Sequence, residues 1–561
     1  MTKVKSRSRK NITVRISWPF LLFLIYCFNF SYAADLDEVY GPLVKKGSVL
    51  YAGKVNFFVL DEEGTHGSST EDKFEAAPCL PSFGNLLKFS PLDSLELALG
   101  LDQDFPAKYK RFTYNNSGGL ASIQKYEIDY FMDFILGLRI RRGPTEAYLD
   151  ISEKRQKTNW GYGDYPAPAN YFSYIRAHYE DFKLGLRFLS EEKTPQEQSN
   201  LSKLSEALLS DNQMNLEAEL GYKKGKLRRT TDYYHSAGLY IYNFYHVLKP
   251  HFIPKIAIRY GLNKDLEVGT GLFYTTPFKY EYEYKRYDPG GTSRLIFGAY
   301  KLKNNFYVPL SLRYRPRTNL EFMFSSDFNS ITQKLDYREK NIADTVINYP
   351  PKKLIYYNTI PTLKVAFLCD DKKKIQEDEF SALTKDLLLK NQCLIEFLYK
   401  KDITHLRKGS SNGPQNIIDP YNVFLYPLDY FVAGSEYASF FTGNYSKTAT
   451  NILPQNYYLC QVGFNYGVTD NLNAGFRFGY HSSSSLHHFT LSDMVSRFYR
   501  FRPYYYFDTS CDWRVSKNSL FSFNSRFIPK YTTYLTEGEY PDEFHSKNNY
   551  VEVSFSLKIL F

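Results

Sequence analysis

The sequence predicts an all-β fold, a transmembrane antiparallel β-barrel of about 18 strands, within a range of roughly 12 to 18. Aromatic residues make up 18% of the chain, with 51 Tyr and 45 Phe, yet the mean hydropathy is only −0.43. A lipid-facing surface with aromatic girdles around a polar interior combines these two properties. Strand-like segments of alternating polarity also recur, joined alternately by short turns and long polar loops. We therefore expect a membrane barrel rather than several soluble domains.

The carboxy-terminal stretch 550–561 is the clearest strand. Side chains on a strand alternate between two faces, so one face is an unbroken apolar row of Val551, Val553, Phe555, Leu557, Ile559 and Phe561, opposite Glu552, Ser554, Ser556 and Lys558. The last strand of a soluble sandwich would show the same alternation. With its terminal Phe, however, the stretch resembles the closing strand of bacterial outer-membrane β-barrels. This resemblance implies that the barrel assembly machinery recognises Phe555, Leu557, Ile559 and Phe561.

The amino terminus predicts a cleaved secretory signal over residues 1–33. Basic residues precede an apolar run from Ile16 to Phe30, and Ser31 and Ala33 supply the small residues before a cleavage site. The run is too short for a transmembrane helix, which needs roughly 20 apolar residues. Cys27 is not expected to carry a lipid, because Tyr26 occupies the position where such sites need a small residue.

Removing the signal lowers the net charge of the chain. The formal net charge of +10 includes the bases of the signal, which are Lys3, Lys5, Arg7, Arg9, Lys10 and Arg15. The mature chain is thus only mildly basic, and no nucleic-acid partner is predicted. We expect residues 34–561 to form a single barrel in the lipid of the outer membrane of a Gram-negative cell. The remaining cysteines are too few for a disulfide scaffold of this length.

Internal similarity divides the barrel into three repeats. Matching turns lie at 91–94, 261–265 and 467–471, and a second turn follows each of them at 142–145, 315–319 and 515–518. The segment 188–217 also aligns without gaps on 367–396. Self-similarity of this kind indicates repeated structural units, which we place near 48–190, 213–369 and 391–561 with about six strands each. Because an open sheet in lipid would leave backbone groups unpaired, the three units are expected to close one ring with both chain ends in the periplasm.

Two linkers, near 191–212 and 370–390, are predicted to be short periplasmic helices. Leu201, Leu204 and Leu208 in the first have the spacing of one helical face, as do Phe380, Leu383 and Leu387 in the second. Such helices could pack on the barrel rim. Alternatively, they could plug the lumen or dock a periplasmic partner.

Charged residues alternate with the predicted lipid-facing rows. Val308, Leu310 and Leu312 oppose Arg313, and Phe476, Phe478 and Tyr480 oppose Arg477. Along 266–285 we expect the aromatic residues on the outer face and Glu267, Lys279, Glu281, Glu283 and Lys285 on the inner face. A one-residue slip would place charges in hydrocarbon at a cost of roughly 2–4 kcal/mol per midplane Arg or Lys. The candidate lumen-lining residues are Arg139, Arg187, Glu217, Glu219, Arg259, Glu267, Arg313, Glu321, Arg477, Arg500, Arg502 and Arg526.

Two further features concern the turns and the linkers. The hairpin 259–269 resembles those of transporter-like outer-membrane proteins grouped with phenol-degradation clusters, but it covers a small part of the chain and implies no residue roles. Cys369 and Cys393 flank the second linker. If this linker joins two neighbouring strand ends in an oxidising compartment, the two cysteines form a candidate disulfide.

The function predicted from these features is an outer-membrane channel that passes small polar solutes through a water-filled lumen. No motif for catalysis, for a metal or for a cofactor occurs, although a barrel-borne hydrolase could assemble its residues from different strands. Mixed inner charges suit polar or zwitterionic solutes, unless the arginines merely pair with carboxylates along the wall. The alternative is a barrel-anchored surface or polysaccharide-associated binding or export protein with a plugged lumen and long loops such as 403–455.

Overall fold

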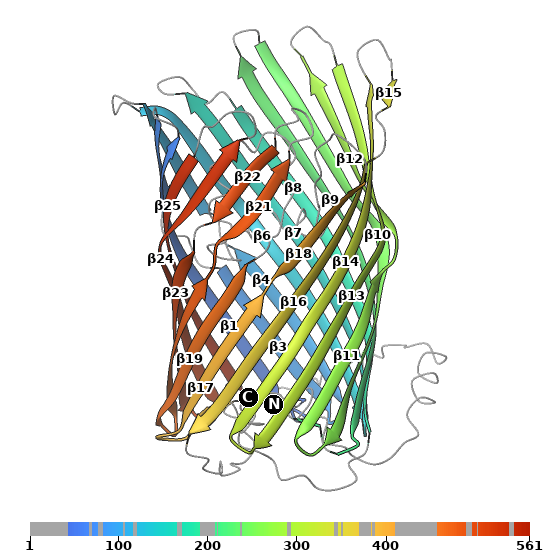
Figure 1. Cartoon of the computed structure of the whole chain (residues 1–561), viewed down its shortest axis with the longest axis vertical. Helices are drawn as coiled ribbons and strands as arrows, with labels where there is room; N and C mark the ends of the chain where they lie inside the picture. Colours follow the sequence, from blue (N-terminus) through green and yellow to red (C-terminus); the bar gives the residue numbers. More distant parts are fainter. Residues whose placement is uncertain are drawn as a thin grey trace, which may run out of the picture.

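The computed structural model is one closed antiparallel β-barrel with tilted strands (Figure 1). It describes residues 43–561 except 67–69, 77–81, 105–106, 116–119, 165–170, 191–207, 210, 236–237, 289–292, 341–345, 349–351, 370–382, 384–386, 410–456, 490–495, 502 and 538–543. The predicted signal and most of the two predicted helical linkers lie outside the described residues. Within these ranges, no helix is long and apolar enough to span a membrane.

The strands follow the chain around the ring, and each strand of the wall, continuous or split into two segments, pairs with the strands before and after it. The first third of the barrel comprises β1 (Val49–His66), β2 (Thr70–Ala76), β3 (Ser82–Leu92), β4 (Leu95–Asp104), β5 (Ala107–Asn115), β6 (Leu120–Arg142), β7 (Thr145–Asp164) and β8 (Tyr171–Leu189). The second third comprises β9 (Met214–His235), β10 (Gly238–Asn263), β11 (Leu266–Thr275), β12 (Phe278–Tyr287), β13 (Ser293–Arg317), β14 (Leu320–Lys340), β15 (Val346–Asn348) and β16 (Lys352–Cys369).

The last third comprises β17 (Cys393–Lys401), β18 (Ile403–Gly409), β19 (Tyr458–Thr469), β20 (Leu472–His481), β21 (Ser484–Phe489), β22 (Ser496–Phe501), β23 (Tyr504–Ser516), β24 (Ser519–Glu537) and β25 (Phe544–Leu560). Several wall strands are split in two, namely β2/β3, β4/β5, β11/β12, β15/β16, β17/β18, β20/β21 and β22/β23. The described segments therefore make 18 wall strands. β25 pairs with β1 from Leu560↔Leu50 to Phe544↔His66 and closes the ring. The predicted fold class and strand number are confirmed.

The two ends of the barrel differ. Tight turns lie at one end, where the carboxy terminus is also found, and the strands of the second third extend farthest at the opposite end (Figure 1). Short turns are typical of the periplasmic end of outer-membrane barrels. We call this end the short-turn end.

The two faces of the wall follow the predicted alternation near the short-turn end. Leu312 and Tyr314 are exposed on the outer face, whereas the intervening inward Arg313 is buried. Phe476 is likewise exposed beside buried Asn473. The outer face carries a band of large apolar side chains, including Leu97, Leu99, Leu136, Leu184, Leu186, Leu272, Phe322, Phe324, Trp513 and Phe527. Because hydrocarbon demands apolar contact, this band fixes which face of every strand points outward.

The expected face assignment fails beyond residue 276. β11 ends at Thr275 and β12 begins at Phe278, with Thr276 bonded to Phe252 and Pro277 unable to donate a ladder hydrogen bond. Phe278 stacks on the inward His251 with a centroid distance of 3.9 Å, so the alternation reverses at this break. Lys279, Glu281, Glu283 and Lys285 therefore lie on the outer face together with cross-strand partners such as Tyr245 and Phe297, and not on the predicted inner face.

Three matching corners lead into β1, β9 and β17. Each contains a residue with positive φ, which is Gly47 (78°), Asn212 (61°) or Asn391 (67°), a conformation that only Gly and Asn or Asp adopt readily. The N–H groups of these residues donate to the carbonyls of Ser90, Gly261 and Gly467 at 2.7, 2.8 and 2.8 Å. The division into three repeats stays a prediction, and these repeated contacts support it.

Candidate functional site

The first group of inward charges lies near the short-turn end of β4, β6, β7 and β8. Glu146 is fully buried, and its carboxylate accepts hydrogen bonds from Arg139 (2.9 Å), Arg141 (2.8 Å) and Arg187 (3.0 Å). Arg139 also pairs with the buried Glu96 at 3.2 Å. A carboxylate shared by several guanidinium groups compensates their burial. We call Glu96, Arg139, Arg141, Glu146 and Arg187 the first ionic cluster.

Glu217 and Glu219 extend the first ionic cluster onto β9. Glu217 pairs with Lys255 at 2.6 Å and lies 3.8 Å from Arg187. Tyr148 donates its hydroxyl hydrogen to Glu219 at 2.5 Å, and the Arg187 guanidinium lies 4.3 Å from the Tyr148 ring centroid. The ring rests against Gly185, where any larger residue would collide with it.

A second ionic cluster repeats the arrangement on β10, β11, β13 and β14. Arg259 donates to Glu267 at 2.7 and 2.9 Å, and Arg313 lies 3.7 Å from Glu267 and 3.2 Å from Glu321. Arg315 also pairs with Glu321. The predicted candidates Arg259, Glu267, Arg313 and Glu321 therefore form one linked set, in which the arginines and glutamates pair with one another.

Backbone segments from the corners reach these inner carboxylates. The N–H of Val44 donates to Glu96 Oε2 at 3.0 Å, and the N–H of Leu209 donates to Glu267 Oε2 at 2.9 Å. In the last third, Asn473 donates its amide hydrogen to the carbonyl of Leu388 at 3.0 Å and accepts from the N–H of the same residue. Leu208, Leu209, Leu387 and Leu388 are all buried. The described ends of the two linkers thus lie against the inner wall at the short-turn end.

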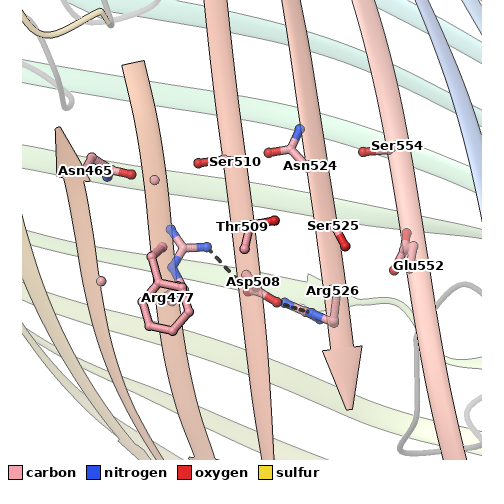
Figure 2. A pocket seen from close by; sticks show the side chains of 13 residues that line it. Asn465, Arg477, Asp508, Thr509, Ser510, Asn524, Ser525, Arg526, Glu552 and Ser554 are labelled. Atoms are coloured by element: carbon pink, nitrogen blue, oxygen red, sulfur yellow. Dashed lines mark hydrogen bonds and ion pairs between the residues drawn. The ribbon is translucent and has the colours of Figure 1, made fainter. Parts of the chain in front are cut away.

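The last third of the wall contains a different group. Asp508 on β23 lies between Arg526 on β24, at 2.8 and 3.0 Å, and Arg477 on β20, at 3.8 Å (Figure 2). The Arg526 guanidinium also lies 5.2 Å from the Tyr506 ring centroid. A hollow of about 380 Å³ opens beside these residues. Apart from Phe476, the residues that line this hollow are polar or glycine, and they include Gly475, Ser510, Asn524 and Ser554.

The structure brings most of the sequence-predicted residues to the inner wall but groups them locally. Arg500 belongs to β22, and its side chain lies outside the described residues, as does the whole of Arg502. Sequence reasoning missed Glu96, Arg141, Glu146, Lys255, Arg315 and Asp508. The alternation rule could have found Glu96, which follows Leu95 as the second residue of its strand. Asp508 had no such signal, because it follows the aromatic run Tyr504–Phe507.

Cys369 and Cys393 are direct cross-strand partners on β16 and β17. Their Sγ atoms lie 3.4 Å apart as free thiols. The Cα separation of opposed antiparallel residues falls within the range that a disulfide spans. The disulfide itself stays a prediction.

We expect protein purified from the outer membrane to contain this crosslink, because the periplasm is oxidising. Peptide mapping in denaturant without reductant should find the peptides of Cys369 and Cys393 joined. Cys460 and Cys511, on the non-adjacent strands β19 and β23, serve as the internal control and should be alkylated. Alkylation of Cys369 and Cys393 under the same conditions would contradict the expectation.

Comparisons with known proteins add little at the sequence level, since no family model and no curated protein matches the chain. Among solved structures, the Pseudomonas putida toluene transporter TodX is 8% identical over 95% of this chain and 95% of that chain, with a TM-score of 0.30. The Ralstonia pickettii toluene transporter TbuX is 7% identical over 95% and 98%, with a TM-score of 0.33. The ferripyoverdine receptor of Pseudomonas aeruginosa is 10% identical over 93% and 72%, with a TM-score of 0.40. Likenesses at these scores carry no argument about function.

The class of the protein follows from its own fold. A closed ring of 18 strands has no unpaired sheet edge between its first and last strands, an apolar band covers its outer face, and polar and ionised side chains line its inner face. Only such a closed barrel satisfies its backbone hydrogen bonds within lipid by strands alone. The chain is an outer-membrane β-barrel protein.

Proposed function

We propose that this protein is an outer-membrane channel that passes small polar solutes through a water-filled lumen. The observation that carries the proposal is the inner wall of the last third, where Arg477 and Arg526 keep 41% and 43% of their side-chain surface exposed. Charged groups tolerate such a position at little desolvation cost only where water reaches them. A ring of this size is wide enough for an aqueous lumen.

One observation favours the alternative, a binding or export protein with a plugged lumen. The described linker ends at Leu208, Leu209, Leu387 and Leu388 are buried against the inner wall near the short-turn end. They narrow the mouth of the barrel there. A periplasmic partner that binds at the linkers stays a prediction. The two functions differ in whether solutes and ions cross the folded barrel.

The mature protein is expected to produce stepwise conductance in a planar bilayer. Changing Lys364→Glu and Arg477→Glu together should shift the reversal potential toward cation selectivity, because both side chains are inward and partly exposed. Arg259 and Arg313 are unsuitable for this test, since both are held against buried carboxylates.

The matched control for the double reversal is Lys285→Glu together with Lys279→Glu, which changes the net charge equally on the outer face of the extended strands. Selectivity should be unchanged in the control. Folded protein that stays electrically silent would contradict the channel and favour the plugged-lumen alternative.

A further inference from the structure

The last third of the wall departs from the charge pattern of the other two thirds. In those, cross-strand partners near the short-turn end carry a Glu and an Arg, as in Glu96↔Arg139 and Glu267↔Arg313. The matching pair in the last third is Asn473↔Asp512. A second pair differs in the same way. In the first third, Arg141 is the cross-strand partner of Glu146, whereas the matching Arg514 of the last third is the partner of Leu520. The buried ionic cluster of the other thirds is therefore missing from the described residues at this level.

Charges appear instead one layer farther from the short turns. Arg477, Asp508, Arg526 and Glu552 are successive cross-strand partners on β20, β23, β24 and β25, and we call them the charged row. The equivalent residues in the other thirds lie the same number of residues from the matching turns. In the first third they are Gly100, Ile135, Ser152 and Asp181. In the second third they are Gly271, Pro309, Asp327 and Ile360. The charged row is a property of the last third alone.

The two arginines of the charged row are not equally engaged. Arg526 makes two short hydrogen bonds to Asp508, at 2.8 and 3.0 Å. Arg477 reaches Asp508 only at 3.8 Å, and its Nε is buried without a hydrogen-bond partner among the described residues. Because the Arg477 side chain keeps 41% of its surface exposed, its terminal guanidinium N–H groups are available to an anion. A guanidinium offers a carboxylate two parallel N–H groups.

The hollow beside Arg477 determines what else a ligand must offer. Asn465, Ser510, Asn524 and Ser554 line the hollow along one level of the wall, next to the charged row (Figure 2). Hydroxyl and amide groups both donate and accept hydrogen bonds, which suits a hydroxylated solute. The volume of about 380 Å³ lies near the lower end of ligand sites, roughly 300–1,000 Å³. Asp508 and Glu552 balance the two arginines, so a second anionic group on the ligand would be repelled.

We infer that this hollow binds a small hydroxylated monocarboxylate, with its carboxylate on Arg477 and its hydroxyls on Asn465, Ser510 and Asn524. The inference deepens the proposed channel function, on which it rests for the route by which the solute arrives. It also gives the lumen a preferred solute, whereas the two ionic clusters of the other thirds consist of mutually paired charges.

The test is isothermal titration of the folded full-length mature barrel in detergent with sodium gluconate. Gluconate should bind, whereas sorbitol, which lacks the carboxylate, and acetate, which lacks the hydroxyls, should bind at least about tenfold more weakly. Arg477→Gln should weaken gluconate binding by about tenfold or more, and Arg477→Lys by less. The matched control Lys364→Gln removes the same charge from an inward side chain of similar exposure, 37%, paired with Glu396, and should leave binding unchanged.

Two results would overturn the inference. One is no gluconate binding by barrel shown to be folded by its migration on a semi-native gel. The other is an equal loss in Arg477→Gln and Lys364→Gln, which would indicate a general effect of lumen charge. Conductance separates this inference from the channel itself. A conducting barrel that ignores gluconate contradicts only the binding site, and a silent barrel that binds gluconate contradicts only the channel.

Discussion

Replacing Glu146 by leucine is expected to destabilise the barrel by about 3–5 kcal/mol, the usual cost of removing one partner of a buried ion pair. The Glu146 side chain is completely buried, and three guanidinium groups converge on it. Without the carboxylate, Arg139, Arg141 and Arg187 would repel one another in a site with little water. The measurement is urea unfolding of the barrel in liposomes, in which the folded fraction is followed on a gel without heating, where folded and unfolded protein migrate differently.

The matched control is Glu153→Leu on the same strand. Glu153 also bonds to two neighbours, Arg155 and His178, but its side chain keeps 34% of its surface exposed. Exposed pairs are typically worth about 0–1 kcal/mol, so this variant should unfold almost like the parent. An equal effect of the two substitutions would show that burial of Glu146 is not what makes it important. Leucine itself fits a wall of this kind, because Leu520 occupies the matching position in the last third.

Much of the barrel could be predicted because lipid imposes a simple rule. A strand that crosses hydrocarbon must keep one face apolar, so the apolar rows that contain Leu312, Phe476 and Phe555 indicated the strands and their inward faces from local sequence alone. The matching turns then gave the order of strands, since short turns connect antiparallel neighbours. The same rule loses force outside the apolar band, and there the faces of Lys279, Glu281, Glu283 and Lys285 were predicted wrongly.

That error has a definite physical cause. Pro277 interrupts the ladder, and the break between β11 and β12 lets Phe278 turn inward onto His251. A sequence shows the proline but not how many residues the break consumes. Each added residue reverses every later side chain. Beyond the lipid, both faces contact water, so no burial pattern reveals the reversal.

The grouping of the inner charges could not be predicted for another reason. Arg139, Arg141 and Arg187 meet at Glu146 through the register of three strands, and register is a property of the closed ring rather than of any one segment. Glu146 also follows the turn at Gly143 and Pro144, a position that ordinarily indicates exposure. The burial of the linker ends against the inner wall could not be predicted either, because the spacing of Leu208 and Leu387 is also that of one face of a helix.

The carboxy-terminal row should be required for insertion into the outer membrane. Phe555→Ser together with Phe561→Ser is expected to leave export intact but to reduce the amount of folded barrel in the outer-membrane fraction severely. Phe555 contacts the rings of Phe57, Phe521 and Phe523 at centroid distances of 6.1, 6.1 and 5.3 Å on the outer face. Phe561 is 69% exposed there, while its backbone exchanges hydrogen bonds with Val49 at 2.8 and 3.1 Å.

A second double variant separates recognition by the assembly machinery from simple loss of apolar surface. Phe521→Ser together with Phe527→Ser removes the same side chains from the outer face of the neighbouring β24, at a similar cost of roughly 1.5–3 kcal/mol for each phenylalanine. Both double variants retain every backbone group of the β25 ladders with β1 and β24. If the terminal row is a signal, only the first pair should block insertion, while both pairs should be comparably weakened when refolded into liposomes without the assembly machinery. Equal insertion of the two variants in cells would contradict the role of Phe555 and Phe561 as a signal, and the row would then act only as lipid-facing surface.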